Sequence, residues 1–591
     1  MTIDDILLSG TELRKVPDAA RKLLGLAGRA LHTETRVAAA ARELVAGLLA
    51  EPWGQVSVSV YETGRLVSLA PWLAGHAPRV EFLLAAQRPD GGWGARGGYA
   101  LVPTLSATEA LLAELRREDS GGGRDAVVRT TWRGLGALRR WSHGHDPCDQ
   151  CDSKNPCDSR ELPDMPAIEL IVPALTAMVN GHLAAMGEGE PLELPPGMST
   201  AKLSVVRTRL ASGAAVPQKV LHALEVAGET AAGAPGVVPS PIPSPEEASP
   251  RPGEKTSPRV AVSTEDSRPP EAHAIGASPA AGAAWLGVRG SGDEDSPVRR
   301  YLETVAAHYG GPVPCAVPVT VFERSWTLSW LRRAGVPVTV PEELVTALDA
   351  AIGPGGTAAG PGLPPDADTT SVGLYALALL RAPREPGALW TYETETHFCT
   401  WQGEEGASPT VNAHVLDAFG EYLRVCADPP EAAGRYAAAV RKLAAWLRDC
   451  QRADGSWLDR WHASPYYATA CCALALQEYG GAESAGAVRA AVRWLLGTQR
   501  EDGSWGCWEG TAEETAYALQ TLLLTAPARA DPRAVAVERG HRRLLAMVTG
   551  RGEPIDAPAL WHDKDLYFPS AIVRAAILGA LHLAVRARPP E

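Results

Sequence analysis

Two carboxylates stand directly before an apolar run in the segment PPDADTTSVGLYALALL, residues 364–380: Asp366 and Asp368. A helix N-cap explains one of them, because its oxygens accept hydrogen bonds from unpaired backbone N–H groups and the Pro-rich approach fits a helix start. That interpretation leaves the second aspartate without a role. Carboxylates held close together share a proton, which raises the pKa of one of them. The pair therefore suggests a proton donor at the start of a buried helix.

The length and charge of the chain limit its possible class. At 591 residues it exceeds one typical core, so two domains are expected. The 56 Lys and Arg residues stand against 69 Asp and Glu residues, a formal net charge of −13 without a basic run, which argues against a nucleic-acid partner. Apolar runs such as AAILGALHLAV are too short to span a bilayer, and the TIDD after Met1 is unlike a signal peptide. These features predict a cytoplasmic protein without a transmembrane segment.

The segment HGHDPCDQCDSKNPC gathers side chains that can bind zinc: His143, His145, Cys148, Cys151 and Cys157. They lack the paired CxxC spacing that strongly indicates a zinc site. A polar surface loop is therefore the favoured interpretation, with a structural metal as the alternative. The other seven of the ten cysteines are scattered through apolar helical patterns, as expected for reduced thiols that act as small hydrophobes.

A second unusual segment spans residues 228–273 and is dense in Pro, Ser, Ala and charged residues, with few large apolar side chains. Such a composition cannot bury enough surface to offset the entropy lost on ordering. It predicts a disordered insertion.

The remaining chain contains internal repeats. QRPDGGW at 87, QRADGSW at 451 and QREDGSW at 499 are near copies that each follow an apolar helical stretch and contain an Asp-Gly turn. Segments such as TLSATEALLAEL, DTTSVGLYALALL and TAEETAYALQTLLL are small and apolar nearly all round, which is typical of helices buried on most faces. These patterns predict an all-α fold in which helical hairpins surround a central cavity, and two such α-barrels fit the length.

The repeats, taken with the Asp-x-Asp segment, resemble the class II terpene cyclases, and more specifically the bacterial cyclases of prenyl diphosphates. SVYETGRLVSLAPWL, GGYALVPTLSATEALL, LPDMPAIELIVP and LWHDKDLYFP carry the closer similarity. The resemblance implies a double α-barrel, with the active site between two domains called β and γ. Residues 1–50 would begin the β domain, 51–295 would form the γ domain, and 296–591 would complete the β domain and carry the DxDTT motif.

The resemblance also implies catalytic roles. Asp368 corresponds to the general acid of the family's DxDD motif, and Asp366 would polarise it. Thr369 replaces the fourth motif residue, and its hydroxyl can hydrogen-bond Asp368. In NAHVL, His414 or Asn412 could donate a hydrogen bond to Asp368, leaving the other carboxyl oxygen to deliver the proton. The alternative for His414 is a hydrogen-bonded core histidine.

A diphosphate substrate requires its charge to be neutralised. By resemblance, Lys564 in LWHDKDLYFP is the candidate to contact the diphosphate, and a salt bridge with Asp563 or Asp565 is the alternative. Glu109 in TLSATEALL is the candidate ligand for Mg²⁺, although a Glu in such a helix can equally pair with an arginine.

Aromatic residues would surround the carbocation, because a ring face stabilises a desolvated cation. The candidates for lining the cavity are Trp461, Tyr466, Tyr467 and Trp326, with core packing as the alternative. The tryptophans of the repeat turns are assigned to stability, since the family uses them to tie adjacent helices: Trp93, Trp457 and Trp505.

The expected activity is protonation-initiated cyclisation. No convincing DDxxD segment is present, so the product should keep its diphosphate. The DADTT form resembles the variant found in bacterial drimenyl diphosphate synthases, and this resemblance favours farnesyl diphosphate as substrate and drimenyl diphosphate as product. The alternatives are conversion of geranylgeranyl diphosphate to a copalyl-type diphosphate, cyclisation of squalene, and a non-catalytic prenyl-binding α-barrel.

Overall fold

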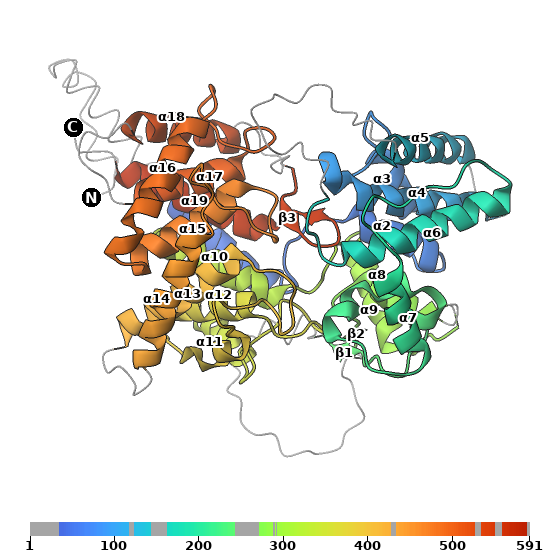
Figure 1. Cartoon of the computed structure of the whole chain (residues 1–591), viewed down its shortest axis with the longest axis horizontal. Coiled ribbons are helices and arrows are strands. Elements are labelled where there is room, and N and C mark those ends of the chain that lie inside the picture. The colour runs from blue at the N-terminus through green and yellow to red at the C-terminus, as the bar shows by residue number, and fades with distance from the viewer. Residues whose placement is uncertain are drawn as a thin grey trace, which may run out of the picture.

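The computed structural model describes residues 35–117, 123–142, 162–242, 271–287, 290, 292–426, 433–525, 533–549 and 558–587. The fold is all-α, and its helices form two bodies side by side (Figure 1). The zinc-capable segment at 143–157 lies outside the described residues.

The β domain is a closed ring of inner helices inside an outer layer. The inner helices contact one another in the order α10 (Thr320–Arg333), α12 (Ala367–Leu379), α13 (Pro409–Val425), α15 (Pro465–Tyr479), α17 (Ala512–Leu524) and α19 (Ser570–Arg586), and α19 returns to α10. The outer helices are α11 (Glu342–Ala351), α14 (Ala433–Asp449), α16 (Ala485–Thr498) and α18 (Arg533–Thr549). Nearly every residue of α12 and α17 is buried, as their small apolar sequences predict.

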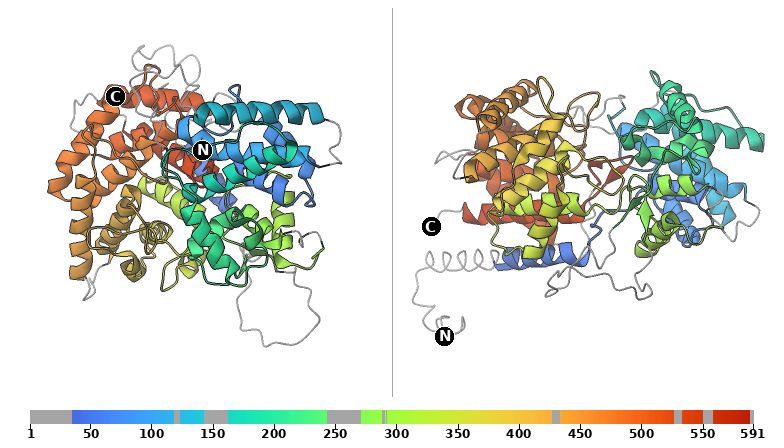
Figure 2. Two further views of the ribbon diagram at one scale, coloured as in Figure 1. Left: turned by 45° about the vertical axis from the view of Figure 1, so that its right-hand side comes forward. Right: turned by 90° about the horizontal axis from the view of Figure 1, so that it is seen from below.

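The N-terminal helical segment, residues 35–50, belongs to the β domain. Val37, Leu44 and Leu48 share one hydrophobic core with α10 and α19, although the γ domain separates them in the sequence. Figure 2 shows this segment lying along the β domain.

The γ domain repeats the same plan at a smaller size. Its inner ring runs through α2 (Val60–Leu69), α4 (Leu101–Leu115), α6 (Ile168–Met186), the 3₁₀ segment η5 (Gln218–Ala231) and α8 (Pro279–Leu286), which returns to α2. The outer elements are α3 (His76–Ala85), α5 (Arg124–Ser142), α7 (Ala201–Ala211) and α9 (Pro297–His308). The hydrophobic core continues through α9 to Val317, so the boundary lies near that residue and not at 295.

Part of the predicted disordered insertion is folded. Strand β1 (Ser240–Pro241) pairs antiparallel with β2 (His273–Ala274), and Val237 and Ile242 are buried in the γ core. The prediction of disorder is therefore wrong for residues 228–242, because the few apolar residues of this stretch find a core to enter. Residues 243–270 lie outside the described part of the chain.

The three repeats tie neighbouring helices together in one way. In the second repeat, the Trp457 indole donates to Leu447 O of α14 at 2.8 Å, and Gln451 donates to Gly455 O in the turn at 2.8 Å and to Ala487 O of α16 at 2.9 Å. Gly455 has φ +97°, and a Cβ there would lie 2.6 Å from Ala490 O, so the turn requires glycine. The other two repeats form the same bonds through Trp93 and Gln87, and through Trp505 and Gln499.

One described helix, α6, is long and apolar enough to cross a membrane by length and composition alone, which the sequence analysis did not anticipate. About half of the apolar stretch is buried (56%), with Ile171, Val172 and Val179 packed in the γ core. Core helices of globular proteins commonly meet the same length and composition criteria, so this feature is weak evidence for a membrane span.

Candidate active site

A cavity of about 640 Å³ lies between the two domains. Its walls come from η5, the segment before α6 and the first turns of α6 and α7 in the γ domain, and from α10, the start of α12 and the loops before α13, α15 and α19 in the β domain. Because it takes residues from both domains, neither domain alone encloses it.

Asp368 lies in the first turn of α12 and lines this cavity. Its Oδ1 lies 2.6 Å from Nδ1 of His414 in the first turns of α13. Burial would lower the pKa of His414, but Asp368 raises it well above its usual value, so Nδ1–H donates to Asp368. An imidazolium beside the carboxyl group makes a proton on the other oxygen, Oδ2, easier to transfer. The predicted His414 contact is thus present.

Asp366 is the N-cap of α12, and its Oδ1 accepts from Thr369 N at 2.6 Å. The Thr369 hydroxyl donates to Asp366 Oδ2 at 3.0 Å, and not to Asp368 as predicted. Burial raises the pKa of Asp366 to about 7, with a further increase from Asp368 that the bonds from Thr369 partly offset. Two carboxyl groups of the cavity wall, that of the buried Asp366 and that of the half-buried Asp368, therefore stand at the start of the same helix.

Asn412 does not reach Asp368. Its side chain accepts from Phe398 N at 2.8 Å and donates to Phe398 O at 3.0 Å and Ser408 O at 2.8 Å, which ties α13 to the preceding loop. Residues two apart on a helix face different directions, so Asn412 and His414 cannot share one partner. The prediction that either could anchor Asp368 is wrong for Asn412.

Three of the four predicted aromatics line the cavity: Trp326, Trp461 and Tyr467. The Trp326 indole donates to the Tyr467 hydroxyl at 2.9 Å and lies edge-on to the His414 ring, 5.5 Å between centroids. Tyr466 is absent from the cavity wall and packs on Trp494, 4.7 Å between ring centroids. Further aromatic residues of the wall were not predicted: Phe322, Trp401, Trp561 and Tyr567.

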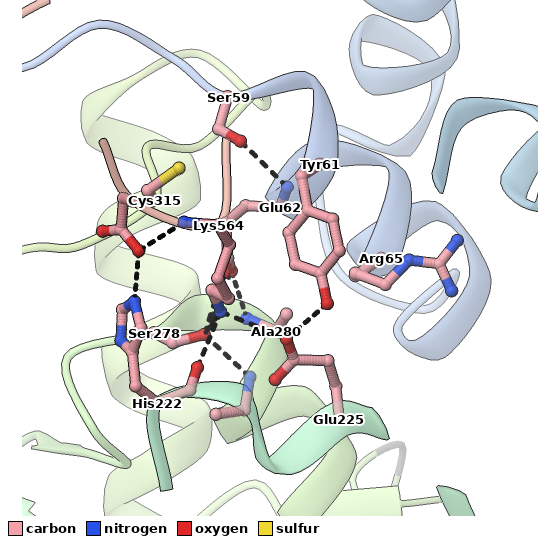
Figure 3. A network of polar contacts seen from close by, with 12 residues as sticks. Ser59, Tyr61, Glu62, Arg65, His222, Glu225, Ser278, Ala280, Cys315 and Lys564 are labelled. Carbon is pink, nitrogen blue, oxygen red and sulfur yellow. Dashed lines mark hydrogen bonds and ion pairs between the residues drawn. The ribbon is translucent and has the colours of Figure 1, made fainter. Parts of the chain in front are cut away.

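Lys564 is not at the cavity mouth. Its side chain is fully buried, with Nζ in contact with Glu62, Glu225 and Ser278 (Figure 3). The alternative of a surface salt bridge with Asp563 or Asp565 is not realised either, since the ion pairs of Lys564 are with the two glutamates. The sequence could not show this burial, because DKD reads as an exposed polar turn.

Glu109 also lies away from the cavity, in the γ core. Its carboxylate pairs with Arg65 at 2.5 Å and lies 3.0 Å from His182. Burial would raise the pKa of Glu109, but Arg65 and the bonds from His182 and Ser68 lower it to about 2. A carboxylate satisfied in this way does not fit a Mg²⁺ ligand. Across the described residues, no group of three or more His, Cys, Asp or Glu side chains could hold a metal ion.

Comparison with known proteins decides the family. Residues 406–550 match the squalene-hopene cyclase C-terminal domain. The ent-copalyl diphosphate synthase of Streptomyces sp. (strain KO-3988) is 40% identical over 546 residues, which cover 92% of this chain and 95% of that protein. The chain belongs to the bacterial class II terpene cyclases. Labda-7,13-dienyl diphosphate synthase of Streptomyces clavuligerus is 38% identical over 568 residues, 93% of each chain.

A solved structure supports the same assignment. The ent-copalyl diphosphate synthase from Streptomyces platensis aligns with this cyclase at a TM-score of 0.80 and 40% identity, and covers 93% of this chain and 99% of that one. The chain is thus an enzyme with the double α-barrel of its family, and the alternative of a non-catalytic α-barrel is set aside.

The cyclase should lose activity as pH rises through neutrality. The Asp366 carboxyl group, with a pKa of about 7, is mostly protonated below neutral pH and ionises above it, which removes a proton from the start of α12. We expect kcat to fall with increasing pH between about 7 and 9, by up to tenfold per pH unit when one deprotonation controls the rate. Initial rates at constant ionic strength test this, and assays returned from pH 9 to pH 7 control for inactivation. A rate unchanged up to pH 9 would contradict it.

Cationic side chains also line the cavity, and the sequence analysis did not predict them. Arg460 pairs with Glu404 at 2.7 Å and with Asp164 at 3.0 Å, and Lys202 pairs with Glu405 at 3.2 Å. Lys219 at the start of η5 is exposed and lines the cavity, and no described carboxylate forms an ion pair with it. A lone lysine in VPQKVLHAL carries no motif, so only the folded structure shows its place.

Proposed function

We propose that this cyclase converts geranylgeranyl diphosphate to a bicyclic copalyl-type diphosphate. The position of Asp368 carries the proposal: it lines an aromatic-walled cavity and its Oδ1 is held by His414. The names of the relatives support a copalyl-type product over the drimenyl product suggested by the DADTT segment. They also argue against squalene as the substrate.

In the proposed reaction, Asp368 transfers the proton on Oδ2 to the terminal alkene of the substrate. The two following alkenes attack in turn, two C–C bonds form, and a carbon next to the final cation loses a proton. Substrate and product are isomers, and the C–O bond to the diphosphate stays intact. The rings of Trp326, Trp461 and Tyr467 supply π faces that stabilise the cation.

We propose the pair of His222 and Asp563 as the acceptor of the final proton. Both residues line the cavity, and His222 Nε2 lies 2.6 Å from Asp563 Oδ1. Burial would raise the pKa of Asp563, but His222 lowers it below its ordinary value, so the carboxylate is ionised at neutral pH. His222 Nδ1 lies 2.7 Å from Gly276 O, which leaves the second oxygen of Asp563 as the free acceptor.

We propose that the diphosphate binds Lys219, with Arg460 nearby at the same cavity. Lys219→Ala is expected to raise KM for the prenyl diphosphate about tenfold, since a hydrogen bond to a charged group contributes about 1.5–3 kcal/mol and exposure reduces that value. The effect on kcat should be small. Steady-state kinetics test this, with Lys442→Ala as control because Lys442 pairs with Glu393 in the β domain away from the cavity. An unchanged KM would contradict the assignment.

Incubation of the purified protein with farnesyl and, separately, geranylgeranyl diphosphate tests the proposed reaction. Products are dephosphorylated and identified by mass spectrometry. A bicyclic C20 alcohol from geranylgeranyl diphosphate is expected, whereas a bicyclic product from farnesyl diphosphate alone would restore the drimenyl reaction. A parallel reaction with EDTA tests the prediction of magnesium as cofactor, for which Glu109 supplies no free ligand.

A further inference from the structure

A short hairpin of the β domain enters the γ domain. It consists of β3 (Trp561–His562) and β4 (Leu566–Tyr567), which pair antiparallel between α18 and α19. Trp561 packs in the core of the β domain, whereas Leu566 packs in a core of the γ domain. The hairpin therefore bridges the two bodies that enclose the cavity.

The Lys564 side chain at the hairpin tip is surrounded by γ-domain groups (Figure 3). Its Nζ contacts Glu62 of α2, lies 3.1 Å from Glu225 of η5, and donates to Ser278 Oγ at 2.8 Å and His222 O at 2.7 Å. Burial would lower the pKa of Lys564, but Glu225 and Glu62 raise it above its ordinary value, so the ammonium stays charged. One buried cation thus joins α2, η5 and the residue that caps α8.

The two residues beside Lys564 reinforce the same contact. Asp563 faces His222 of η5 at 2.6 Å. Asp565 Oδ2 accepts from Tyr61 N at 3.2 Å and from Ser59 Oγ at 3.3 Å, both at the start of α2. We call Asp563, Lys564 and Asp565 the interdomain clasp.

The clasp is continuous with the cavity wall. Trp561, His562, Asp563 and Tyr567 of the hairpin line the cavity, whereas Lys564 and Asp565 do not. We propose that Lys564 is a positioning residue: its buried ion pairs with Glu62 and Glu225 fix the hairpin against the γ domain and thereby set the shape of the cavity wall. It does not touch the substrate.

The charges of the clasp provide a compensating pair of changes. Removal of the Lys564 ammonium leaves Glu62 and Glu225 buried together without a counter-charge, which is strongly unfavourable. Removal of the Glu62 charge in the same molecule relieves part of that repulsion. Lys564→Met should therefore loosen the hairpin, and the double change Lys564→Met with Glu62→Gln should tighten it again.

Hydrogen–deuterium exchange of the full-length protein tests this without any substrate. In Lys564→Met, exchange of residues 558–569 and 218–231 should accelerate at least tenfold while α12 and α13 exchange as in the wild type, and the double variant should recover most of the protection. Lys442→Met, which removes a lysine paired with Glu393 in the β domain, is the matched control and should leave these segments unchanged.

Kinetics give the second readout, which rests on the proposed cyclisation. Misplacement of the wall should lower kcat of Lys564→Met about 10- to 100-fold and raise the share of water-quenched, hydroxylated product, with KM changed less than about threefold. A large rise in KM with normal exchange would overturn the proposal, because it would make Lys564 a diphosphate ligand. If the wild type cyclises no prenyl diphosphate, the proposed function is wrong. The exchange data still test whether Lys564 fixes the hairpin against the γ domain.

The double variant also decides the case in which Lys564→Met does not fold. A folded double variant with protected hairpin segments would support the clasp. Failure of both variants to fold would overturn it, since the lysine would then serve the stability of a whole domain and not the contact between the two.

Discussion

Asp368→Asn is expected to lower the rate of cyclisation about 10³-fold, because general acid catalysis contributes about 10²–10⁴-fold and the carboxamide has no acidic proton. The carboxamide has nearly the same shape and still meets His414 Nδ1, which lies 2.6 Å from Oδ1 in the wild type. Single-turnover assays with geranylgeranyl diphosphate measure the effect. They report the chemical step apart from product release.

The matched control for this variant is Asp349→Asn. Asp349 is exposed and pairs with Arg384 at 3.2 Å, so its loss should leave the rate unchanged. Turnover by Asp368→Asn at the wild-type rate would show that another group supplies the proton. The roles given to His414 and the surrounding wall would then also be wrong.

Trp457→Ala is expected to destabilise the β domain by about 3–5 kcal/mol, the usual range for removal of a fully buried tryptophan from a core. The indole is 0% exposed and donates to Leu447 O at 2.8 Å, so its removal leaves both a cavity and an unpaired carbonyl. The midpoint of urea unfolding, followed by circular dichroism, measures the change.

Trp132→Ala is the control for the loss of an indole as such. Trp132 is 36% exposed on the outer helix α5, where substitutions usually change stability by about 0.5 kcal/mol. Equal midpoint shifts in the two variants would mean that the repeat tryptophans do not tie the helices together as described.

The repeats were sufficient to predict the all-α fold, and the Asp-x-Asp segment was sufficient to predict two carboxyl groups at the start of a buried helix. Both depend on local chemistry: Asp-Gly turns, helices that are apolar on all faces, and an aspartate at a helix N-cap. The end of the γ domain could not be predicted in the same way, because α9 shows the same amphipathic pattern whichever core it joins.

Side-chain direction accounts for several of the missed site residues. Neighbours in a helix point about 100° apart, so Tyr467 reaches the cavity while Tyr466 cannot. The same geometry separates Asn412 from His414. A resemblance between segments places residues near a site, but only the helix rotation decides which of them enters it.

Partners brought from distant segments account for the rest. Glu109 pairs with Arg65 and His182, and Lys564 pairs with Glu62 and Glu225. No local sequence pattern predicts these pairs. Lys219 shows the opposite case, an unremarkable lysine that the fold brings to the cavity. Buried charges of this kind follow from the tertiary structure alone.

The most direct test of the account is a reaction with geranylgeranyl diphosphate in D₂O, with products analysed by mass spectrometry before and after dephosphorylation. Protonation by Asp368 predicts a bicyclic diphosphate that carries one deuterium at the carbon where the terminal alkene was protonated, with no release of inorganic diphosphate. An unlabelled product, or a labelled product formed with loss of the diphosphate, would contradict protonation-initiated cyclisation.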